Sequence, residues 1–288
     1  MRSNRFIFSV VGSLTLGAGA TALQAAPYTA WTQPYADGQA STMLLLHMNE
    51  TSGTNAANTG DKVTWGTSDG TYSPDATGNV ASGAGIPASG FGSAFDSNSS
   101  RTLSVPASTY LLGDDTNGRT IEMWFKADTL GASQTLAAKY DTTMGYPGGR
   151  QFTLSILNGK LYFGAFRVDS VLVELTGTTT ITTGQWHHVA VQYDTAKYNN
   201  PSSNQWELFL DGNLETSAVY GAWGFTSTSN PLWIGSYDGT QDFFDGQIDE
   251  VRISNTQYDF QPAPVPEPAS LSLLALGGVM LLGRKRRM

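Results

Sequence analysis

The sequence predicts an all-β protein built as a single antiparallel β-sandwich. From about residue 42 onward, short apolar-rich runs alternate with clusters of Gly, Asn, Ser, Asp and Thr, which is the pattern of short strands joined by turns. No window of a dozen residues has a helical period, apart from the two terminal segments. Asn158-Gly159 and Asp211-Gly212 each follow such a run, and both dipeptides are typical of tight hairpin turns.

Eleven runs are predicted as strands of this sandwich. They span 42–48, 102–105, 119–126, 134–140, 151–157, 160–167, 171–175, 186–193, 206–210, 232–235 and 247–253. Within 119–126 the alternation puts Ile121, Met123 and Phe125 on one side and Glu122 and Trp124 on the other. The stretch 49–101 is rich in glycine and serine and weakly patterned, so it predicts a long loop.

Charge and cysteine usage exclude several function classes. Residues 27–266 carry 10 basic and 23 acidic side chains, and this negative charge opposes binding to nucleic acid. The chain has no cysteine, which excludes disulfides, thiolate metal sites and cysteine nucleophiles. A three-histidine metal site needs His47, His187 and His188 together, yet the last two are adjacent on a strand and point to opposite faces. We expect His187 to be a hydrogen-bonded core residue.

The N-terminus predicts a secretory signal peptide over residues 1–26, followed by an irregular lead-in over 27–41. Arg2 and Arg5 form a basic start, an apolar stretch follows to Leu16, and small residues up to Ala25 and Ala26 offer cleavage points. An uncleaved anchor or a buried helix is the alternative interpretation. Because basic residues at both ends stay inside, we expect the body between them to lie across the inner membrane.

The C-terminus combines three ordered features after a linker at 257–264. Pro266-Glu267-Pro268 precedes an apolar stretch over 271–283, and a basic cluster ends the chain. Such a helix reaches roughly 20 Å, short of a hydrocarbon layer of about 30 Å, so a permanent span is doubtful on length alone. Residues 265–288 resemble the PEP-CTERM sorting signal of Gram-negative bacteria, with a plain tail anchor as the alternative.

This resemblance implies a route of export. In that family an exosortase in the inner membrane recognises the Pro-Glu-Pro tripeptide and removes the tail. The resemblance therefore implies an exosortase as a partner, a transient stay in the inner membrane, and delivery to the cell surface or the extracellular matrix.

The body carries a second resemblance. Five blocks occur in order, at 120–126, 184–190, 208–212, 231–235 and 244–253. The last block, which contains Asp249-Glu250-Val251-Arg252-Ile253, is the most specific. Residues 42–256 resemble the LamG-like branch of the concanavalin A-like lectin/glucanase superfamily. The resemblance implies a jelly-roll sandwich with one concave sheet, binding of carbohydrate or protein, and often a calcium ion.

Hydrolysis of polysaccharide is a second function to weigh, because relatives of this fold catalyse it. A retaining glycosidase needs two carboxyl groups about 5 Å apart, which Glu-x-Asp-x-Glu on one strand would provide. The sequence has no such run, since Glu122 is followed on its face by Trp124 and Lys126. Carboxylates from separate strands remain an alternative source of a catalytic pair.

Two sets of binding residues are predicted. Alternation puts Asp249 on the side of Val251 and Ile253, where a buried carboxylate needs a cation or several donors. Asn49, Glu50 and Asp249 have the oxygen ligands that calcium prefers; backbone hydrogen bonds or a basic partner for Asp249 are the alternative. Tryptophans and tyrosines suit sugar stacking, and the candidates are Trp65, Trp124 and Trp223, with core or loop packing as the alternative.

Together these patterns predict an exported, non-catalytic module that binds glycan or another matrix component. The alternatives are a polysaccharide-cleaving hydrolase of the same fold and a purely structural matrix protein.

Overall fold

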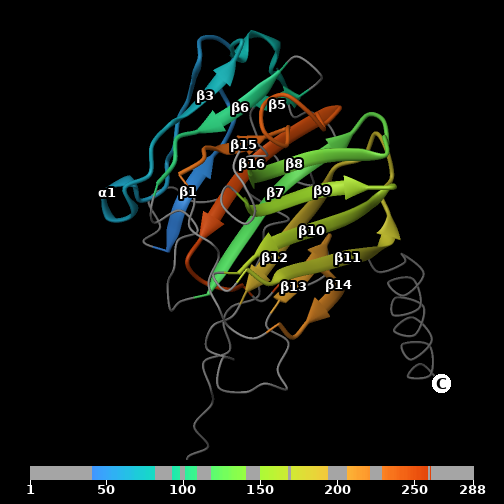
Figure 1. The fold of residues 1–288 in the computed structure, drawn as a ribbon. Coiled ribbons are helices and arrows are strands. Elements are labelled where there is room, and N and C mark those ends of the chain that lie inside the picture. The colour runs from blue at the N-terminus through green and yellow to red at the C-terminus, as the bar shows by residue number, and fades with distance from the viewer. Residues whose placement is uncertain are drawn as a thin grey trace, which may run out of the picture.

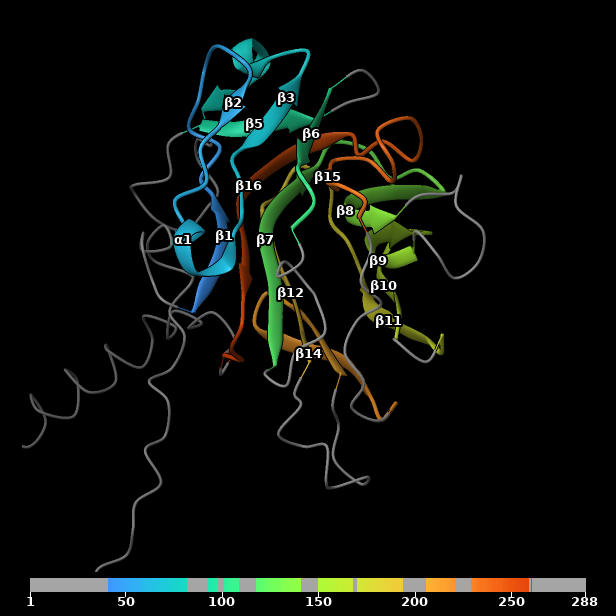
Figure 2. The same ribbon diagram turned by 60° about the vertical axis from the view of Figure 1, so that its left-hand side comes forward.

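A computed structural model describes residues 41–81, 93–97, 101–108, 118–140, 150–167, 170–193, 206–220, 229–258 and 260. These residues form two antiparallel sheets packed face to face, which confirms the predicted β-sandwich (Figure 1; Figure 2). The predicted signal peptide, the sorting signal and both terminal hydrophobic helices lie outside the described residues. Within the described part of the chain, no helix is long and apolar enough to span a membrane.

The first sheet has the strand order β14-β13-β12-β7-β16-β5-β4, and β1 also pairs with β16. Its strands are β1 (Thr42–Leu46), β4 (Val80–Ala81), β5 (Ser93–Ser97), β7 (Arg119–Ala127), β12 (His187–Tyr193), β13 (Trp206–Leu210), β14 (Asn213–Ala218) and β16 (Gly246–Ser254). The second sheet has the order β11-β10-β9-β8-β15-β6-β3-β2. Its strands are β2 (Asn55–Ala56), β3 (Gly70–Ser73), β6 (Thr102–Val105), β8 (Ser133–Tyr140), β9 (Arg150–Leu157), β10 (Lys160–Phe166), β11 (Leu172–Thr180) and β15 (Leu232–Ile234).

All eleven predicted runs are strands in the structure, with ends that shift by a few residues. Both predicted hairpin turns are also present. Asn158 and Gly159 have φ values of 51° and 77°, and Asp211 and Gly212 have 50° and 73°. Two consecutive residues with positive φ define the type I′ turn, whose twist matches that of the flanking strands.

The prediction of one long loop over 49–101 is wrong. The segment contains β2, β3, β4 and β5, the short helix α1 (Lys62–Trp65) and the 3-10 turn η1 (Ala76–Gly78). These elements have two to five residues each, which is too short for a period of two to be recognisable in the sequence. Pairing with strands distant in sequence, such as β3 with β6 and β5 with β16, is what makes them strands.

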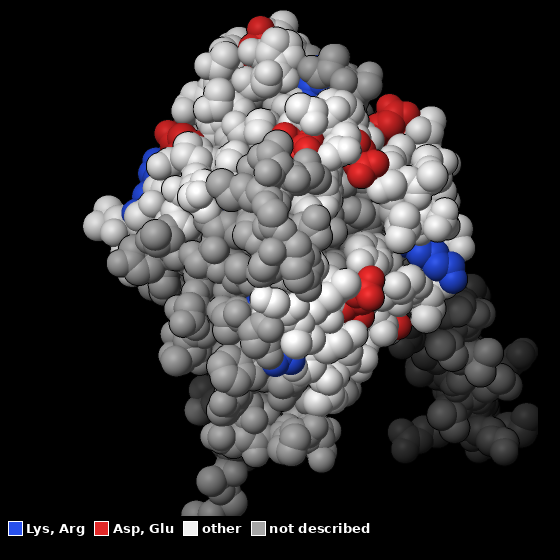
Figure 3. Space-filling view, viewed as in Figure 1, with Lys and Arg blue, Asp and Glu red and all other residues white. Residues whose placement is uncertain are grey.

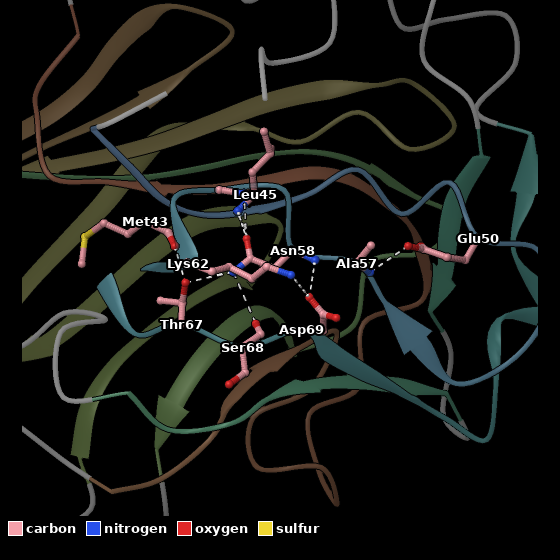
Figure 4. Close-up of polar contacts among 10 residues, drawn as sticks. Met43, Leu45, Glu50, Ala57, Asn58, Lys62, Thr67, Ser68 and Asp69 are labelled. Atoms are coloured by element: carbon pink, nitrogen blue, oxygen red, sulfur yellow. Dashed lines mark hydrogen bonds and ion pairs between the residues drawn. The ribbon is translucent and has the colours of Figure 1, made fainter. Parts of the chain in front are cut away.

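A buried asparagine holds part of this segment against β1 (Figure 4). The Asn58 side chain is 2% exposed; its Oδ1 accepts from the backbone N–H groups of Leu45 at 3.0 Å and Gly60 at 2.9 Å. Its Nδ2 donates to Thr67 Oγ1 at 2.9 Å, and the Thr67 hydroxyl in turn donates to the Met43 carbonyl at 2.7 Å. One side chain therefore satisfies backbone groups of β1 and of the loop before α1.

The core between the sheets follows the predicted alternation. Ile121, Met123 and Phe125 of β7 lie in it, as do Trp206 and Leu208 of β13. Part of the outer face of the first sheet is also buried. Tyr258 and Phe260, which follow β16, pack there in a second apolar cluster with Ala190 and Phe209.

This covered outer face contains a buried network of charge. Glu122 is fully buried; Arg252 Nη2 lies 2.6 Å from its Oε1, and His188 Nε2 lies 3.2 Å from its Oε2. Burial alone would raise the pKa of Glu122, but the opposing charge of Arg252 and the hydrogen bond from His188 hold it well below its usual range. The Arg252 guanidinium also lies 4.4 Å from the centre of the Tyr258 ring.

The edges of the two sheets meet at β11 and β14, where one carboxylate joins them. Glu215 Oε2 accepts from the backbone N–H groups of Thr178 at 2.6 Å and Thr179 at 2.8 Å. The hydroxyls of the same two threonines donate to Glu215 at 3.0 and 2.7 Å. These bonds occupy N–H groups at the edge of β11 that would otherwise be open to pairing with another chain.

We predict that Asn58→Ala lowers the free energy of unfolding by about 2 to 4 kcal/mol, because the buried N–H group of Leu45 and the partly buried N–H group of Gly60 lose their acceptor. Denaturant unfolding measures this. The control is Lys62→Ala, which removes an exposed ion pair with Asp69 and should change stability by no more than about 0.5 kcal/mol. Equal effects of the two substitutions would contradict the role given to Asn58.

Candidate functional site

A groove of about 470 Å³ lies on the outer face of the second sheet, across β8 to β11. The described residues that line it come from these strands and from the loop after β15. They are Ser133, Thr135, Tyr140, Thr153, Ser155, Leu157, Tyr162, Gly164, Phe166, Leu172, Tyr237, Gln241 and Asp242. The volume lies within the range of about 300–1,000 Å³ that is usual for small-ligand sites.

The floor of the groove follows from the pleat of β9 and β10. Leu154 and Phe163 point into the core, so the alternate residues Thr153, Ser155 and Tyr162 point to the groove. Gly164 is directly beside Tyr162, and a Cβ there would lie 2.8 Å from the Tyr162 hydroxyl. The glycine therefore leaves room for the Tyr162 ring to lie over the strand.

A row of hydroxyls crosses this floor. Ser155 Oγ lies 3.2 Å from Thr135 Oγ1 and 2.9 Å from Thr153 Oγ1. Thr135 is fully buried, Ser155 is 5% exposed and Thr153 is partly exposed, so the row runs from the interior to the surface. Each hydroxyl can donate and accept a hydrogen bond, as the hydroxyls of a sugar also can.

Aromatic and apolar side chains form the walls. Tyr140, at the end of β8, packs against Tyr237 with ring centres 4.5 Å apart, and both rings are partly exposed. On the other side, Tyr162 is partly exposed, and Leu172 is 37% exposed. Such half-exposed rings are large apolar surfaces with a polar tip, which suits contact with a ligand that has both apolar and hydroxyl groups.

The loop that carries Tyr237, Gln241 and Asp242 is fixed at three points. Asp238 caps its turn by accepting from Thr240 N at 3.0 Å, and from Gln241 Nε2 at 2.8 Å. A Cβ on Gly239 would lie 2.6 Å from the ring of Trp233, so the loop backbone crosses closely above that ring. Thr135 N donates to the Asp242 carbonyl at 2.8 Å, which fastens the loop to β8.

Formal charge is scarce in this groove. Among its described lining residues only Asp242 is ionisable to an anion at neutral pH, and none is Lys or Arg. Just beyond the lining, Tyr162 donates its hydroxyl proton to Glu174 at 2.8 Å. Burial and the neighbouring Glu174 raise the pKa of Tyr162, so its phenol remains protonated. Figure 3 shows this side of the molecule, where acidic and basic groups are both sparse among uncharged atoms.

Of the three predicted tryptophan contacts, Trp124 is not among the described residues that line this groove. Trp124 is 1% exposed and packs edge-on against His188, with ring centres 5.3 Å apart, so its burial leaves no face for a sugar. The prediction of Trp124 as a sugar contact is therefore wrong, and the alternative of core packing holds, because the segment after β16 covers that face of β7. Trp65 is the last residue of α1, and Trp223 lies outside the described residues.

Two of the three predicted calcium ligands lie around Tyr72. Glu50 Oε2 accepts from the Tyr72 hydroxyl at 2.9 Å and its Oε1 from Ala57 N at 2.8 Å. Burial first, then the charge of Glu50 and further that of Asp249, raise the pKa of Tyr72, so both carboxylates act on one buried ring. Asn49, next to Glu50, is exposed.

The expected burial of Asp249 is confirmed, but the strand around it is irregular. Asp249 is 0% exposed and its Oδ1 accepts from Glu250 N at 2.8 Å. A bulge interrupts the pairing of β16 with β7 between Asp249 and Arg252, and Glu250 has a φ of 50°. The expected placement of Asp249 and Val251 on one side of a regular strand therefore does not apply across this bulge. Among the described side chains, no group of three or more His, Asp and Glu could hold a metal ion.

The histidines make structural contacts. His187 is 9% exposed and its Nδ1 lies 2.8 Å from Asp211 Oδ2, which confirms a hydrogen-bonded core position. Burial would lower the pKa of His187, but the hydrogen bond and charge of Asp211 outweigh it and raise that pKa. His188, on the opposite face, is fully buried beside Glu122, and His47 Nδ1 lies 2.6 Å from Glu250.

Comparison with known proteins identifies the family. A family model described as the concanavalin A-like lectin/glucanases superfamily matches residues 96–259, more than half of the chain. The chain belongs to this superfamily. The search of curated proteins found no match.

The chain is also similar to solved structures at low sequence identity. The receptor binding domain of botulinum neurotoxin D superposes with a TM-score of 0.52 at 12% identity, over 83% of this chain and 53% of that one. Domain 4 of the Geobacillus stearothermophilus arabinanase AbnA, in complex with arabinotriose, has a TM-score of 0.47 at 18% identity, over 75% and 93%. The binding domain of Paraclostridial Mosquitocidal Protein 1 has 0.42 at 14%, over 55% and 38%. This superfamily member therefore spans about half or less of the length of two of these neighbours.

Proposed function

We propose that this superfamily member is a non-catalytic module that binds glycan chains in the groove across β8 to β11. The observation that carries the proposal is one open surface that combines partly exposed tyrosines with a row of hydroxyls. Sugar rings present apolar C–H faces to aromatic rings and hydroxyls to polar side chains. The tyrosines and the row of hydroxyls could therefore both contact a sugar.

The carboxylates in the groove support binding in preference to cleavage. Glycosidases use two carboxyl groups, about 5 Å apart in retaining enzymes and roughly 6.5–9.5 Å apart in inverting ones. Asp242 is the one carboxylate among the described lining residues. The other nearby acid, Glu174, accepts the hydroxyl proton of Tyr162 and serves to orient that ring. A hydrolase of the same fold is the alternative, and release of reducing sugar in the binding assay would favour it.

Away from the groove, the Glu50–Asp249 region suits a structural calcium ion. We propose that calcium binds there with Glu50 and Asp249 as carboxylate ligands and Asn49 nearby. Calcium prefers carboxylate and carbonyl oxygens, and it would offset the negative charge that two acids place around Tyr72. Its role would be to stabilise the junction of β16 with the segment after β1.

We also propose that the protein is exported and matures at both ends. The N-terminal signal over 1–26 and the Pro266-Glu267-Pro268 motif before the apolar tail support this route. An exosortase would remove the tail while it lies in the inner membrane, and the product would act at the cell surface or in the extracellular polysaccharide matrix.

For the groove, we predict that Tyr237→Ala weakens binding to the best ligand of a glycan array by about tenfold, because an aromatic contact surface is lost. Tyr237→Phe keeps the ring and should bind within about threefold of the native protein. Isothermal titration measures both, and reducing-sugar release is followed on the same samples. An array signal that survives Tyr237→Ala at full strength would locate binding elsewhere.

For the metal, we predict that calcium raises the melting temperature of the purified protein and that Asp249→Asn abolishes the rise. Asparagine is nearly isosteric, so the loss would reflect the missing charge on a buried ligand. Differential scanning calorimetry with calcium, magnesium and EGTA makes the comparison. A melting curve of the native protein that is the same in calcium and in EGTA would refute the site.

For export, we predict that mass spectrometry of the protein from its native cells finds an N-terminus after Ala25 or Ala26 and no residues of the apolar tail. Glu267→Ala should retain the tail, because the tripeptide is the proposed recognition element. A mature protein with the intact mass of all 288 residues would contradict this proposal.

A further inference from the structure

The groove carries little charge, and the charge that it carries comes from carboxylates. Its described lining has hydroxyl, amide, aromatic and aliphatic groups, with Asp242 as the one charged side chain. A second carboxylate, Glu174, is bound to the Tyr162 hydroxyl at the opposite wall. Both walls thus carry negative charge, and no Lys or Arg side chain among the described lining residues opposes it.

From this charge we infer that the groove selects uncharged glycans and rejects chains that carry carboxylate or sulfate groups. The inference rests on the proposed glycan-binding function and specifies its ligand class. An anionic sugar would need cationic donors, because a carboxylate or sulfate is best bound by Arg or Lys. In this groove it would meet Asp242 and Glu174 instead, and like charges at an interface are strongly unfavourable.

Four of the described basic side chains are occupied away from the groove. Arg252 is paired with the buried Glu122, and Arg101 donates to the carbonyls of Asp75 and Asp96. Lys62 pairs with Asp69 beside α1, and Lys126 lies over the ring of Trp186. The fold therefore assigns these four cations to structural contacts, and no Lys or Arg is among the described lining residues, although Lys160 lies next to the lining residue Leu157.

Asp242 lies where its charge can repel an anionic ligand. Its backbone is held to β8, because Thr135 N donates to its carbonyl at 2.8 Å, and its φ of 48° fixes the turn that ends the loop. Its side chain is exposed at the groove wall. A carboxylate with a fixed backbone at the rim of a ligand site acts on the charge of the ligand even where it makes no direct bond.

The hydrogen-bond donors of the groove point the same way. The Tyr162 proton is committed to Glu174, so the phenol oxygen is left as an acceptor toward the groove. Ser155 Oγ bonds to both Thr135 Oγ1 and Thr153 Oγ1, which uses two of the three hydroxyl protons. Sugar hydroxyls can donate to such acceptors, whereas a carboxylate or sulfate can only accept.

The test compares polymers with the same backbone and different charge. The probes are methyl-esterified and free polygalacturonate, and β-linked mannan with β-linked polymannuronate, titrated against the full-length protein at low and high salt. We expect the neutral member of a pair to bind at least about tenfold more tightly at low salt. High salt should narrow this ratio, since salt screens exposed charges beyond about 8 Å at physiological ionic strength.

Substitutions test whether the preference for neutral polymers comes from Asp242 at the rim of the groove. Asp242→Asn should reduce the ratio of the affinities for the neutral and the acidic polymer by about threefold or more. Asp242→Lys should reduce this ratio further, because it attracts the acidic polymer. The matched control is Asp61→Asn, which makes the same change in net charge at the N-cap of α1, where asparagine caps equally well. This control should leave the ratio unchanged.

The outcomes separate the two levels of the proposal. Tighter or equal binding of the acidic members by the native protein would overturn the selectivity inference and leave glycan binding intact. Equal changes of the ratio in Asp242→Asn and Asp61→Asn would likewise overturn the selectivity inference alone. No binding to either member of either pair, nor to any glycan of the array, would overturn the proposed function and the inference with it.

Discussion

The pleat of β9 and β10 is the constraint on which both the core and the candidate site depend. Each residue that these strands bury, such as Leu154 or Phe163, fixes its neighbour on the opposite face, so the groove floor is set by the same register as the core. A bulge in β8 between Thr135 and Ala137 refines this, since Leu136 and Ala137 both enter the core while Thr135 lines the groove. A floor built on core strands is rigid, and rigidity reduces the entropy lost when a ligand binds.

The walls have a different physical origin from the floor. One wall is the loop after β15, held by its own Asp238 cap, by close contact of Gly239 with Trp233, and by one backbone bond to β8. On the other side, Glu215 secures the β11 edge through four hydrogen bonds to Thr178 and Thr179. The walls are therefore held mainly by hydrogen bonds, whereas the floor is held by core packing.

The features that depend on residues close together in the sequence were predicted correctly. The eleven runs, both type I′ turns and the core side of β7 follow from alternation and from Asn-Gly and Asp-Gly chemistry. The strands within 49–101 could not be predicted in this way, because two to five residues show no period and owe their conformation to distant partners. The groove was partly predictable: the alternation of 151–157 and 160–167 places Thr153, Ser155 and Tyr162 on one face. Tyr237 and Asp242 reach that face only through the pairing of β15 with β8, which no local pattern reveals.

The error over Trp124 shows why the charged face of a strand is an unsafe guide to the binding face. Glu122, Trp124 and Arg252 alternate with core residues and would suit solvent, yet Tyr258 and Phe260 cover them, and Glu122 is kept ionised by Arg252. Breaking such a buried pair is costly, because an unpaired charge would remain inside, so this face is committed to stability. The second sheet has the opposite arrangement, with few charges and an open surface of hydroxyls and rings. Under the proposed function, a ligand without charge needs only that surface. One outer face of the sandwich then serves stability, and the other is open for binding.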